Sequence, residues 1–200
     1  MLIDKDTVQI GKISQDTHLN ILNVLSKFTN EDWVQWSFRQ DKFRVHKYTK
    51  SIPVTFHNLY SLNRWYIDDF KDHQFYKDLF YKEFSLIDQY LGKETVITSF
   101  VFARMDGPSS IPPHIDKHFY FSQIHRIHMC ISADVEKLSL KVSGVHQDIS
   151  VGDVFELNNL RPHGVDYLGI EPRIHAVIDL LPKELEEEFI ISRREVLDKD

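Results

Sequence analysis

Residues 173–180 read Arg-Ile-His-Ala-Val-Ile-Asp-Leu, with an apolar side chain at every second position. Successive side chains of a β-strand point to opposite faces, so the apolar side chains would share one face and the polar ones the other. The pattern predicts a strand that packs one face on a core and lines a cavity with its other face. On this segment alone, an edge strand with one solvated side is an equally good interpretation.

Similar short runs of β-branched and aromatic residues continue between residues 93 and 182, separated by turn signals such as Asp106-Gly107-Pro108 and Gly152-Asp153. Many strands at close spacing, without a helix between each pair, favour antiparallel sheets over a parallel α/β sheet. We therefore predict a mainly β fold with flanking α-helices, a cupin-like jelly roll whose two sheets leave a mouth open for a ligand. The predicted strands are 96–104, the run near residue 114, 125–132, 138–142, 154–157 and 174–181, with 52–56 as a further candidate.

Helical periodicity is found outside this strand region. Residues 16–28 carry Leu19, Leu22, Leu25 and Phe28 at intervals of three, with Ile21 and Val24 beside them, which indicates a helix with one buried face. A second helix is predicted for residues 68–91, with Gly92 as its left-handed cap, and a third for residues 184–197. The apolar face of the second helix would comprise Phe75, Leu79, Phe80, Phe84, Ile87 and Leu91. We expect one domain over residues 1–200, with a jelly-roll core at about 93–182 and helical support at about 14–92 and 183–200.

Composition excludes several classes of protein. The chain has 200 residues, 42% of them hydrophobic and 27% charged, which suits one globular domain. A net charge of -6 without a Lys/Arg cluster argues against a nucleic-acid partner. Cys130 is the only cysteine, which excludes an internal disulfide and cysteine-based zinc modules. No stretch has the length and apolarity of a membrane span, so we expect a cytoplasmic protein with no membrane partner. Its oligomeric state is left open.

A candidate metal site lies in the segment Ile111-Pro-Pro-His-Ile-Asp116. In an extended strand the side chains of His114 and Asp116 point to the same face, so an imidazole nitrogen and a carboxylate oxygen can meet at one point. The two prolines disfavour helix and would give this strand a stiff support. The sequence therefore predicts that His114 and Asp116 bind one metal ion.

A second histidine and an arginine extend this interpretation. His163, directly after Pro162, would complete a set of two nitrogens and one oxygen, which is the donor set of non-haem Fe(II) oxygenases. Arg173 follows ten residues later and offers a planar guanidinium that can hold a carboxylate of a 2-oxo acid through two parallel hydrogen bonds. With 11 histidines in 200 residues, His-x-Asp can also arise by chance, and His163 can be a solvated loop histidine.

The segment 125–131 alternates as well. If Met129 and Ile131 face the helices, then Arg126 and His128 face the cavity, where both could contact an anionic co-substrate. An arginine inside a barrel without a carboxylate partner would be costly, which favours an anionic ligand. Cys130 is interpreted as a small packing residue rather than a nucleophile.

Four segments together resemble the aspartyl/asparaginyl β-hydroxylase family, which includes bacterial free-proline hydroxylases: residues 111–116, 125–129, 152–165 and 173–179. The resemblance covers roughly residues 101–182. It implies an Fe(II)- and 2-oxoglutarate-dependent dioxygenase, with O2 as the other co-substrate, on a double-stranded β-helix. It further implies that His114 and His163 bind iron, that Arg173 binds the distal carboxylate of 2-oxoglutarate, and that Arg126 and His128 line the co-substrate pocket.

One departure from the family bears on the substrate. The peptide-modifying animal members have glycine where this chain has Asp116, whereas the small bacterial amino-acid hydroxylases keep the carboxylate, so the chain is more similar to the latter. The metal set is then His114, Asp116 and His163. We also expect the aromatic segment 117–123 to shape the substrate pocket.

The predicted function is hydroxylation of an amino acid or an amino-acid side chain, with succinate and CO2 as co-products. Two alternatives stay open. One is a non-catalytic jelly-roll protein that binds a metal or small acid as a sensor or structural module. The other keeps iron and 2-oxoglutarate but performs desaturation or ring formation, which the sequence does not distinguish from hydroxylation.

Overall fold

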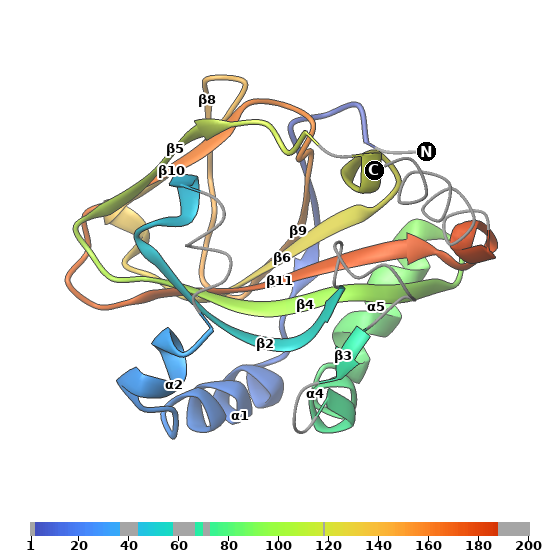
Figure 1. Ribbon diagram of the computed structural model, residues 1–200, viewed down its shortest axis with the longest axis horizontal. Helices are drawn as coiled ribbons and strands as arrows, with labels where there is room; N and C mark the ends of the chain where they lie inside the picture. The colour runs from blue at the N-terminus through green and yellow to red at the C-terminus, as the bar shows by residue number, and fades with distance from the viewer. Residues whose placement is uncertain (1–2, 37–43, 58–66, 70–72, 118, 188–200) are drawn as a thin grey trace, which may run out of the picture.

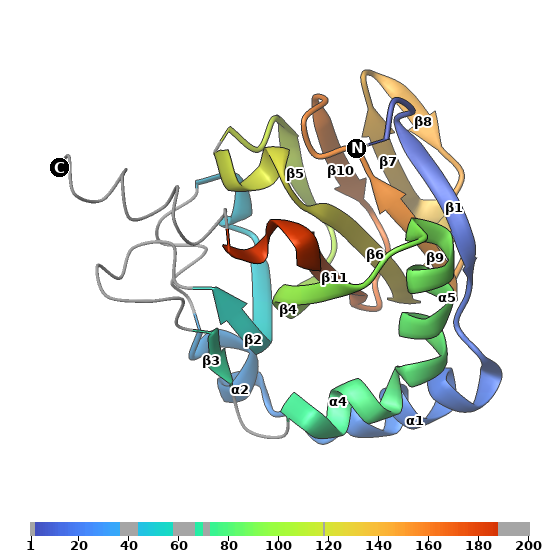
Figure 2. The ribbon, with the colours of Figure 1, turned by 90° about the vertical axis from the view of Figure 1, so that its right-hand side faces the viewer.

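The computed structural model describes residues 3–36, 44–57, 67–69, 73–117 and 119–187. Two antiparallel β-sheets face each other, and the helices cover the outer face of the larger sheet (Figures 1 and 2). This is a double-stranded β-helix, so the predicted jelly-roll fold is confirmed. No helix in the described part of the chain is long and apolar enough to cross a membrane.

The larger sheet has seven strands in the order β1-β9-β6-β11-β4-β2-β3. Their bounds are β1 Thr7–Lys12, β2 Thr49–His57, β3 Ile67–Asp69, β4 Thr95–Met105, β6 His125–Ser132, β9 Asp153–Leu157 and β11 Arg173–Pro182. The smaller sheet has four strands in the order β5-β10-β7-β8. Their bounds are β5 Ser109–His114, β7 Leu138–Val142, β8 Val145–Gln147 and β10 His163–Tyr167.

Strand β11 lies between β6 and β4, so the edge-strand interpretation of residues 173–180 is wrong. The apolar side chains at every second position of residues 174–180 pack in the core beneath the helices, together with Ile127, Met129 and Ile131 of β6. They are Ile174, Ala176, Ile178 and Leu180. Because side chains alternate along a strand, the polar set of β11 and Arg126 and His128 of β6 face the space between the sheets. The predicted orientation of both strands is confirmed.

A second apolar cluster holds the two sheets together. It joins Met105, Phe155 and Leu157 of the larger sheet to the smaller sheet. The smaller sheet contributes Leu138, Leu140, Val142, Val165 and Tyr167. This cluster sets the separation of the sheets and therefore the width of the space in which polar side chains meet.

Helix α1 spans Gln15–Leu25 and begins at an N-cap, Ser14, whose side chain accepts a hydrogen bond from the Thr17 backbone. The predicted helix is present, but only part of the predicted face is buried: Ile21 and Leu25 are buried as expected, while Leu19 and Leu22 are exposed. A step of three residues falls about 60° short of a full helical turn, so a series spaced only by threes leaves the buried face. The prediction for those two leucines was wrong. Helix α2, Asn30–Val34, carries a capping box formed by Thr29 and Asp32.

The second predicted helix is shorter than expected and divided in two. Residues 67–69 form β3 instead, α4 spans His73–Leu79, and α5 spans Tyr81–Leu91, with a break at Phe80. Gly92 has φ 65° and forms the predicted left-handed cap. Tyr76 and not Phe75 is buried at the start of this face, which corrects the predicted phase.

Three short 3-10 turns stand at Arg44–His46, Phe119–Ser122 and Val135–Lys137, and a fourth, Lys183–Leu185, follows β11. The last one begins where the third helix was predicted to start, and most of that predicted helix, residues 188–197, lies outside the described residues. Strands β1, β3, β8 and β10 were not predicted from the sequence. Two of them, β3 and β8, have only three residues each.

Candidate metal and co-substrate site

Two histidines of the smaller sheet face each other across neighbouring strands. In the register of β5 and β10, His114 pairs directly with His163, and their ring centroids are 4.4 Å apart. Gly164 permits this approach, because a Cβ there would lie 2.9 Å from the Ile111 carbonyl oxygen and from the Pro113 nitrogen. His163 is the first residue of β10, and its side chain is buried. These two observations exclude the interpretation of His163 as a solvated loop histidine.

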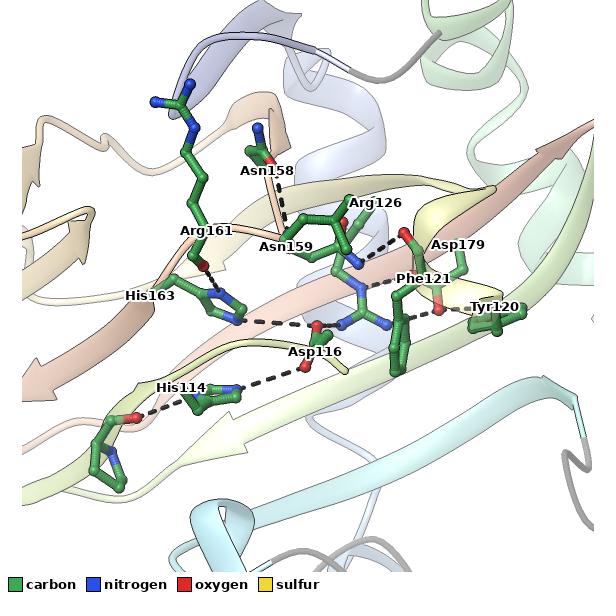
Figure 3. A network of polar contacts seen from close by, with 12 residues as sticks. His114, Asp116, Tyr120, Phe121, Arg126, Asn158, Asn159, Arg161, His163 and Asp179 are labelled. Carbon is green, nitrogen blue, oxygen red and sulfur yellow. Dashed lines mark hydrogen bonds and ion pairs between the residues drawn. The ribbon is translucent and has the colours of Figure 1, made fainter. Parts of the chain in front are cut away.

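Both rings are oriented by a backbone carbonyl two residues earlier in the chain. Nδ1 of His114 lies 2.9 Å from the Pro112 oxygen, and Nδ1 of His163 lies 2.9 Å from the Arg161 oxygen (Figure 3). A carbonyl only accepts hydrogen bonds, so each Nδ1 must carry the proton and donate it. Each Nε2 then presents a lone pair, which is the protonation state that a metal ion requires.

Asp116 completes the donor set, although it does not lie in a strand as predicted. Strand β5 ends at His114, and the backbone N–H of Asp116 donates to the Asn159 carbonyl at 3.1 Å. Its carboxylate lies 3.8 Å from Nε2 of His114 and 4.0 Å from Nε2 of His163. The ligand atoms of the three residues all lie within 4.8 Å of one another, so the structure brings together the whole predicted metal set. Burial lowers the pKa of His163, which favours its neutral, metal-binding form.

Arg173 enters the same pocket from the larger sheet. It is 5% exposed, and among the described residues its Nε has no hydrogen-bond partner, while Nη1 makes a weak hydrogen bond to the Met105 sulfur at 3.4 Å. No carboxylate of the described residues forms an ion pair with it. Burial lowers its pKa to about 10. A buried guanidinium without a counter-ion is strongly unfavourable, so this position favours the binding of an anion.

His175 is a site residue that was not predicted from the sequence. It follows Arg173 on the same face of β11, lines the pocket and is 1% exposed. Neither of its ring nitrogens has a hydrogen-bond partner in the part of the chain that the structure describes. The period-two alternation that placed Arg173 in the cavity could also have identified His175. The ring of His128 lies 5.8 Å from that of His175 and stacks on Phe155 at 5.3 Å. His128 therefore lies at the cavity as predicted, and its contact with a co-substrate stays a prediction.

Arg126 also reaches the pocket, but in a different electrostatic setting. Its guanidinium binds both carboxylate oxygens of Asp179, at 2.7 and 2.8 Å, and one oxygen of Asp116 (Figure 3). Burial acts to lower the pKa of Arg126, but the two facing carboxylates outweigh it and raise the pKa. The two arginines of one pocket thus differ: Arg126 is neutralised by protein carboxylates, and Arg173 is not.

The buried, neutral His175 gives a testable pH dependence of stability. Burial holds its pKa well below the ordinary value of 6.5, whereas the unfolded chain titrates normally. Below pH 6.5 the unfolded state therefore binds more protons, so the free energy of unfolding falls as pH falls, by about 1.4 kcal/mol per pH unit until the folded ring titrates. His175→Asn should remove this contribution.

The measurement is urea unfolding of the metal-free protein at pH 7.5 and 5.5. We expect the parent chain to lose about 1 kcal/mol more than His175→Asn between these pH values. His146→Asn, at a histidine whose side chain is 51% exposed, serves as the control and should behave like the parent chain. An identical pH dependence for the parent chain and His175→Asn would contradict the buried neutral state.

Comparison with known proteins supports the fold. No family model and no curated protein matches the sequence. Among solved structures, an oxidoreductase of the 2OG-Fe(II) oxygenase family from Burkholderia pseudomallei aligns with a TM-score of 0.63 and 12% identity, over 88% of this chain and 84% of that one.

Two further structures have bound ligands named with them. The viral collagen prolyl hydroxylase of Paramecium Bursaria Chlorella virus-1, in complex with 2OG, aligns with a TM-score of 0.57 and 9% identity, over 88% of this chain and 96% of that one. HygX from Streptomyces hygroscopicus, with nickel, 2-oxoglutarate and hygromycin B bound, gives 0.54 and 12%, over 88% and 82%. At these identities the likeness establishes a shared fold, the double-stranded β-helix of 2-oxoglutarate oxygenases.

Proposed function

We propose that this chain is an Fe(II)- and 2-oxoglutarate-dependent dioxygenase that hydroxylates an amino acid or an amino-acid side chain, with succinate and CO2 as co-products. The observation that carries the proposal is one pocket lined both by the two histidines of a His-Asp-His donor set and by a buried arginine that has no carboxylate partner among the described residues. Neither the donor set nor the arginine would be specific for this reaction without the other. Together they provide a place for a divalent cation beside a place for an organic anion.

The donor set fits Fe(II). Two neutral imidazoles and one carboxylate on one side of an octahedron leave the other positions open to co-substrate and oxygen. Among the described residues, the site offers no cysteine and no further carboxylate that would close it, since His114, Asp116 and His163 are the only such group. When bound, Fe(II) supplies the activation of oxygen that is coupled to oxidative decarboxylation of 2-oxoglutarate. The protein holds the three ligands, and the carbonyls that accept from Nδ1 of the two histidines direct each Nε2 toward the metal position.

The charges of the pocket suit a dication and a dianion that bind together. Asp116 and Asp179 carry two negative charges, and Arg126 and Arg173 carry two positive ones, so the charged side chains cancel. The charge of Fe(II), +2, and that of 2-oxoglutarate, -2, also cancel, so the site would stay neutral when both are bound. We propose that Arg173 pairs with the distal carboxylate of 2-oxoglutarate and that His175, two residues further along the same face of β11, donates a second hydrogen bond to it.

We further propose a particular family and a particular kind of substrate. The order of the four matching segments and the carboxylate at position 116 support membership of the aspartyl/asparaginyl β-hydroxylase family, in its small amino-acid-hydroxylating branch. The pocket beyond the metal is mostly apolar, with Ile111, Leu140, Val165 and Val177 among its lining residues. Such walls suit the hydrocarbon part of an amino acid, in which the C–H bond to be hydroxylated lies.

The test begins without oxygen. The purified chain is mixed anaerobically with Fe(II) and 2-oxoglutarate, and we expect a weak visible charge-transfer band that requires both. Air is then admitted with a panel of free amino acids and short peptides, and succinate is quantified against product by mass spectrometry. Slow succinate formation without substrate, accelerated by one member of the panel, is the expected result.

Two results would redirect the proposal. A charge-transfer band without succinate formation under oxygen would favour the non-catalytic metal- or acid-binding protein. A product two mass units lighter than the substrate would indicate desaturation or ring formation in place of hydroxylation.

A further inference from the structure

Arg126 connects two carboxylates that come from different parts of the fold. Asp179 is its direct cross-strand partner in the register of β6 and β11, and Nε and Nη2 of the guanidinium bind its two oxygens. Nη1 binds Oδ2 of Asp116, at the end of the smaller sheet. The guanidinium therefore bridges the larger sheet to the one metal-binding side chain that lies outside a strand.

The far end of this bridge is rigidly supported. The hydroxyl of Tyr120 donates to Oδ2 of Asp179 at 3.0 Å and lies 2.7 Å from Oγ1 of Thr98. Asp179 is 3% exposed and Tyr120 is 2% exposed. The guanidinium carbon lies 4.7 Å from the centre of the Phe121 ring, which fixes its plane. Tyr120 and Phe121 belong to the aromatic segment 117–123, whose contacts here are with the bridge.

The near end of the bridge needs such support. His114 and His163 are held by strand pairing and by their carbonyl contacts, but Asp116 follows the last residue of β5 and has one backbone hydrogen bond, to Asn159. A free carboxylate at a strand end can rotate about two bonds. Arg126 binds Oδ2, which also lies 4.0 Å from Nε2 of His163. Oδ1 is then directed toward Nε2 of His114, at 3.8 Å.

We infer that Arg126, held in place by Asp179, is a positioning residue that orients Asp116 toward the metal and does not bind the co-substrate. The inference rests on the proposed metal site. It replaces the co-substrate contact that the sequence predicts for Arg126. Three of the five N–H groups of this guanidinium already bind two carboxylates. A carboxylate of 2-oxoglutarate would be the third anion at the Arg126 guanidinium, whose charge two carboxylates already neutralise. Arg173 in the same pocket has no carboxylate partner among the described residues.

The test separates metal affinity from co-substrate affinity. Mn(II) is titrated into the metal-free chain, with free Mn(II) followed by its paramagnetic resonance signal, and 2-oxoglutarate is then titrated calorimetrically at saturating Mn(II). Arg126→Lys keeps the charge but loses the fork that reaches both carboxylates, and Asp179→Asn removes the anchor. We expect each variant to lower Mn(II) affinity about 10- to 100-fold and to change 2-oxoglutarate affinity at saturating metal less than about threefold.

Arg104→Lys is the matched control. Arg104 also donates from Nε to a carboxylate, that of Asp106 at 2.6 Å, and lies 5.5 Å from the centre of an aromatic ring, that of Trp33, but it does not line the pocket. Its Mn(II) affinity should equal that of the parent chain. Circular dichroism and thermal unfolding of the three variants identify any general loss of fold. Because Arg126→Lys and Asp179→Asn alter the bridge independently, the test can still be made with one of them if the other does not fold.

The outcomes are distinct. Weaker 2-oxoglutarate binding with unchanged Mn(II) affinity would indicate that Arg126 binds the co-substrate, and it would overturn the inference. Unchanged affinity for both ligands in the two folded variants would also overturn it. If the parent chain itself bound no Mn(II), the proposed function would fail, and the inference would fail with it.

Discussion

Replacement of His114 by alanine is expected to abolish metal-dependent succinate formation. The variant removes one of two imidazole ligands, and the remaining pair, Asp116 and His163, forms an incomplete donor set. Because even a change in the groups that orient ligands typically costs 10- to 100-fold in metal affinity, loss of a ligand should reduce turnover below about 1% of the parent rate at moderate Fe(II) concentration.

The fold should survive this change. His114 is only partly buried and lies at the end of β5, where its one hydrogen bond is to a carbonyl two residues away. The expected loss in the free energy of unfolding is therefore about 1 kcal/mol or less. His146→Ala is the control, because His146 lies in β8 of the same sheet with its side chain 51% exposed. Parent-like succinate formation by folded His114→Ala would refute histidine ligation at this position.

Replacement of Arg173 by methionine should separate ligand binding from stability. Methionine has a similar length and suits the neighbouring Met105, but it cannot bind a carboxylate. Loss of one partner of a buried, hydrogen-bonded charge pair costs about 2–5 kcal/mol, which corresponds to a loss of roughly 30- to 5,000-fold in 2-oxoglutarate affinity. Mn(II) affinity in the absence of 2-oxoglutarate should change little, since Arg173 does not contact the metal ligands.

Without ligand, the variant should be at least as stable as the parent chain. If the methionine packs well, its free energy of unfolding should be higher by about 1 kcal/mol or more. The parent chain buries a cation that has no carboxylate partner among the residues the structure describes, and removal of such a charge relieves a desolvation cost. Arg104→Met is the control. Arg104 lies in the neighbouring strand β4 and, unlike Arg173, has a carboxylate partner, Asp106. Its replacement should lower the free energy of unfolding by up to about 1 kcal/mol and leave the affinity for 2-oxoglutarate unchanged. A strongly destabilised Arg173→Met with unchanged 2-oxoglutarate affinity would show that Arg173 is structural.

Residues with strong local patterns were predicted well from sequence. The alternation along 173–180 and 125–131 identified both central strands and the side chains that face the cavity. The His-x-Asp pair with Pro162-His163 identified a donor set that the structure brings together. These signals are local, because the period of a strand and the chemistry of a ligand are visible within a few residues.

Features that depend on contacts between distant segments were not predicted. The role of Asp179 requires the register between β6 and β11, which places it opposite Arg126, and no single segment encodes that register. Similarly, the segment of β10 was interpreted as a loop, because its five residues, His-Gly-Val-Asp-Tyr, carry only two apolar side chains in alternation, Val165 and Tyr167. The strand is held by pairing on both sides, with β5 and β7. The buried phase of α1 depended on which face the sheet covers.

The two parts of the proposed site lie on opposite sheets, with His114 and His163 on β5 and β10 and Arg173 on β11. The apolar cluster between the sheets therefore acts as a spacer that fixes how far a chelated acid must reach from the metal to the guanidinium. A larger or smaller side chain at Leu140 or Phe155, which belong to neither ligand set, would alter that reach. The preferred chain length of the diacid would then depend on packing residues that bind neither the metal nor the acid.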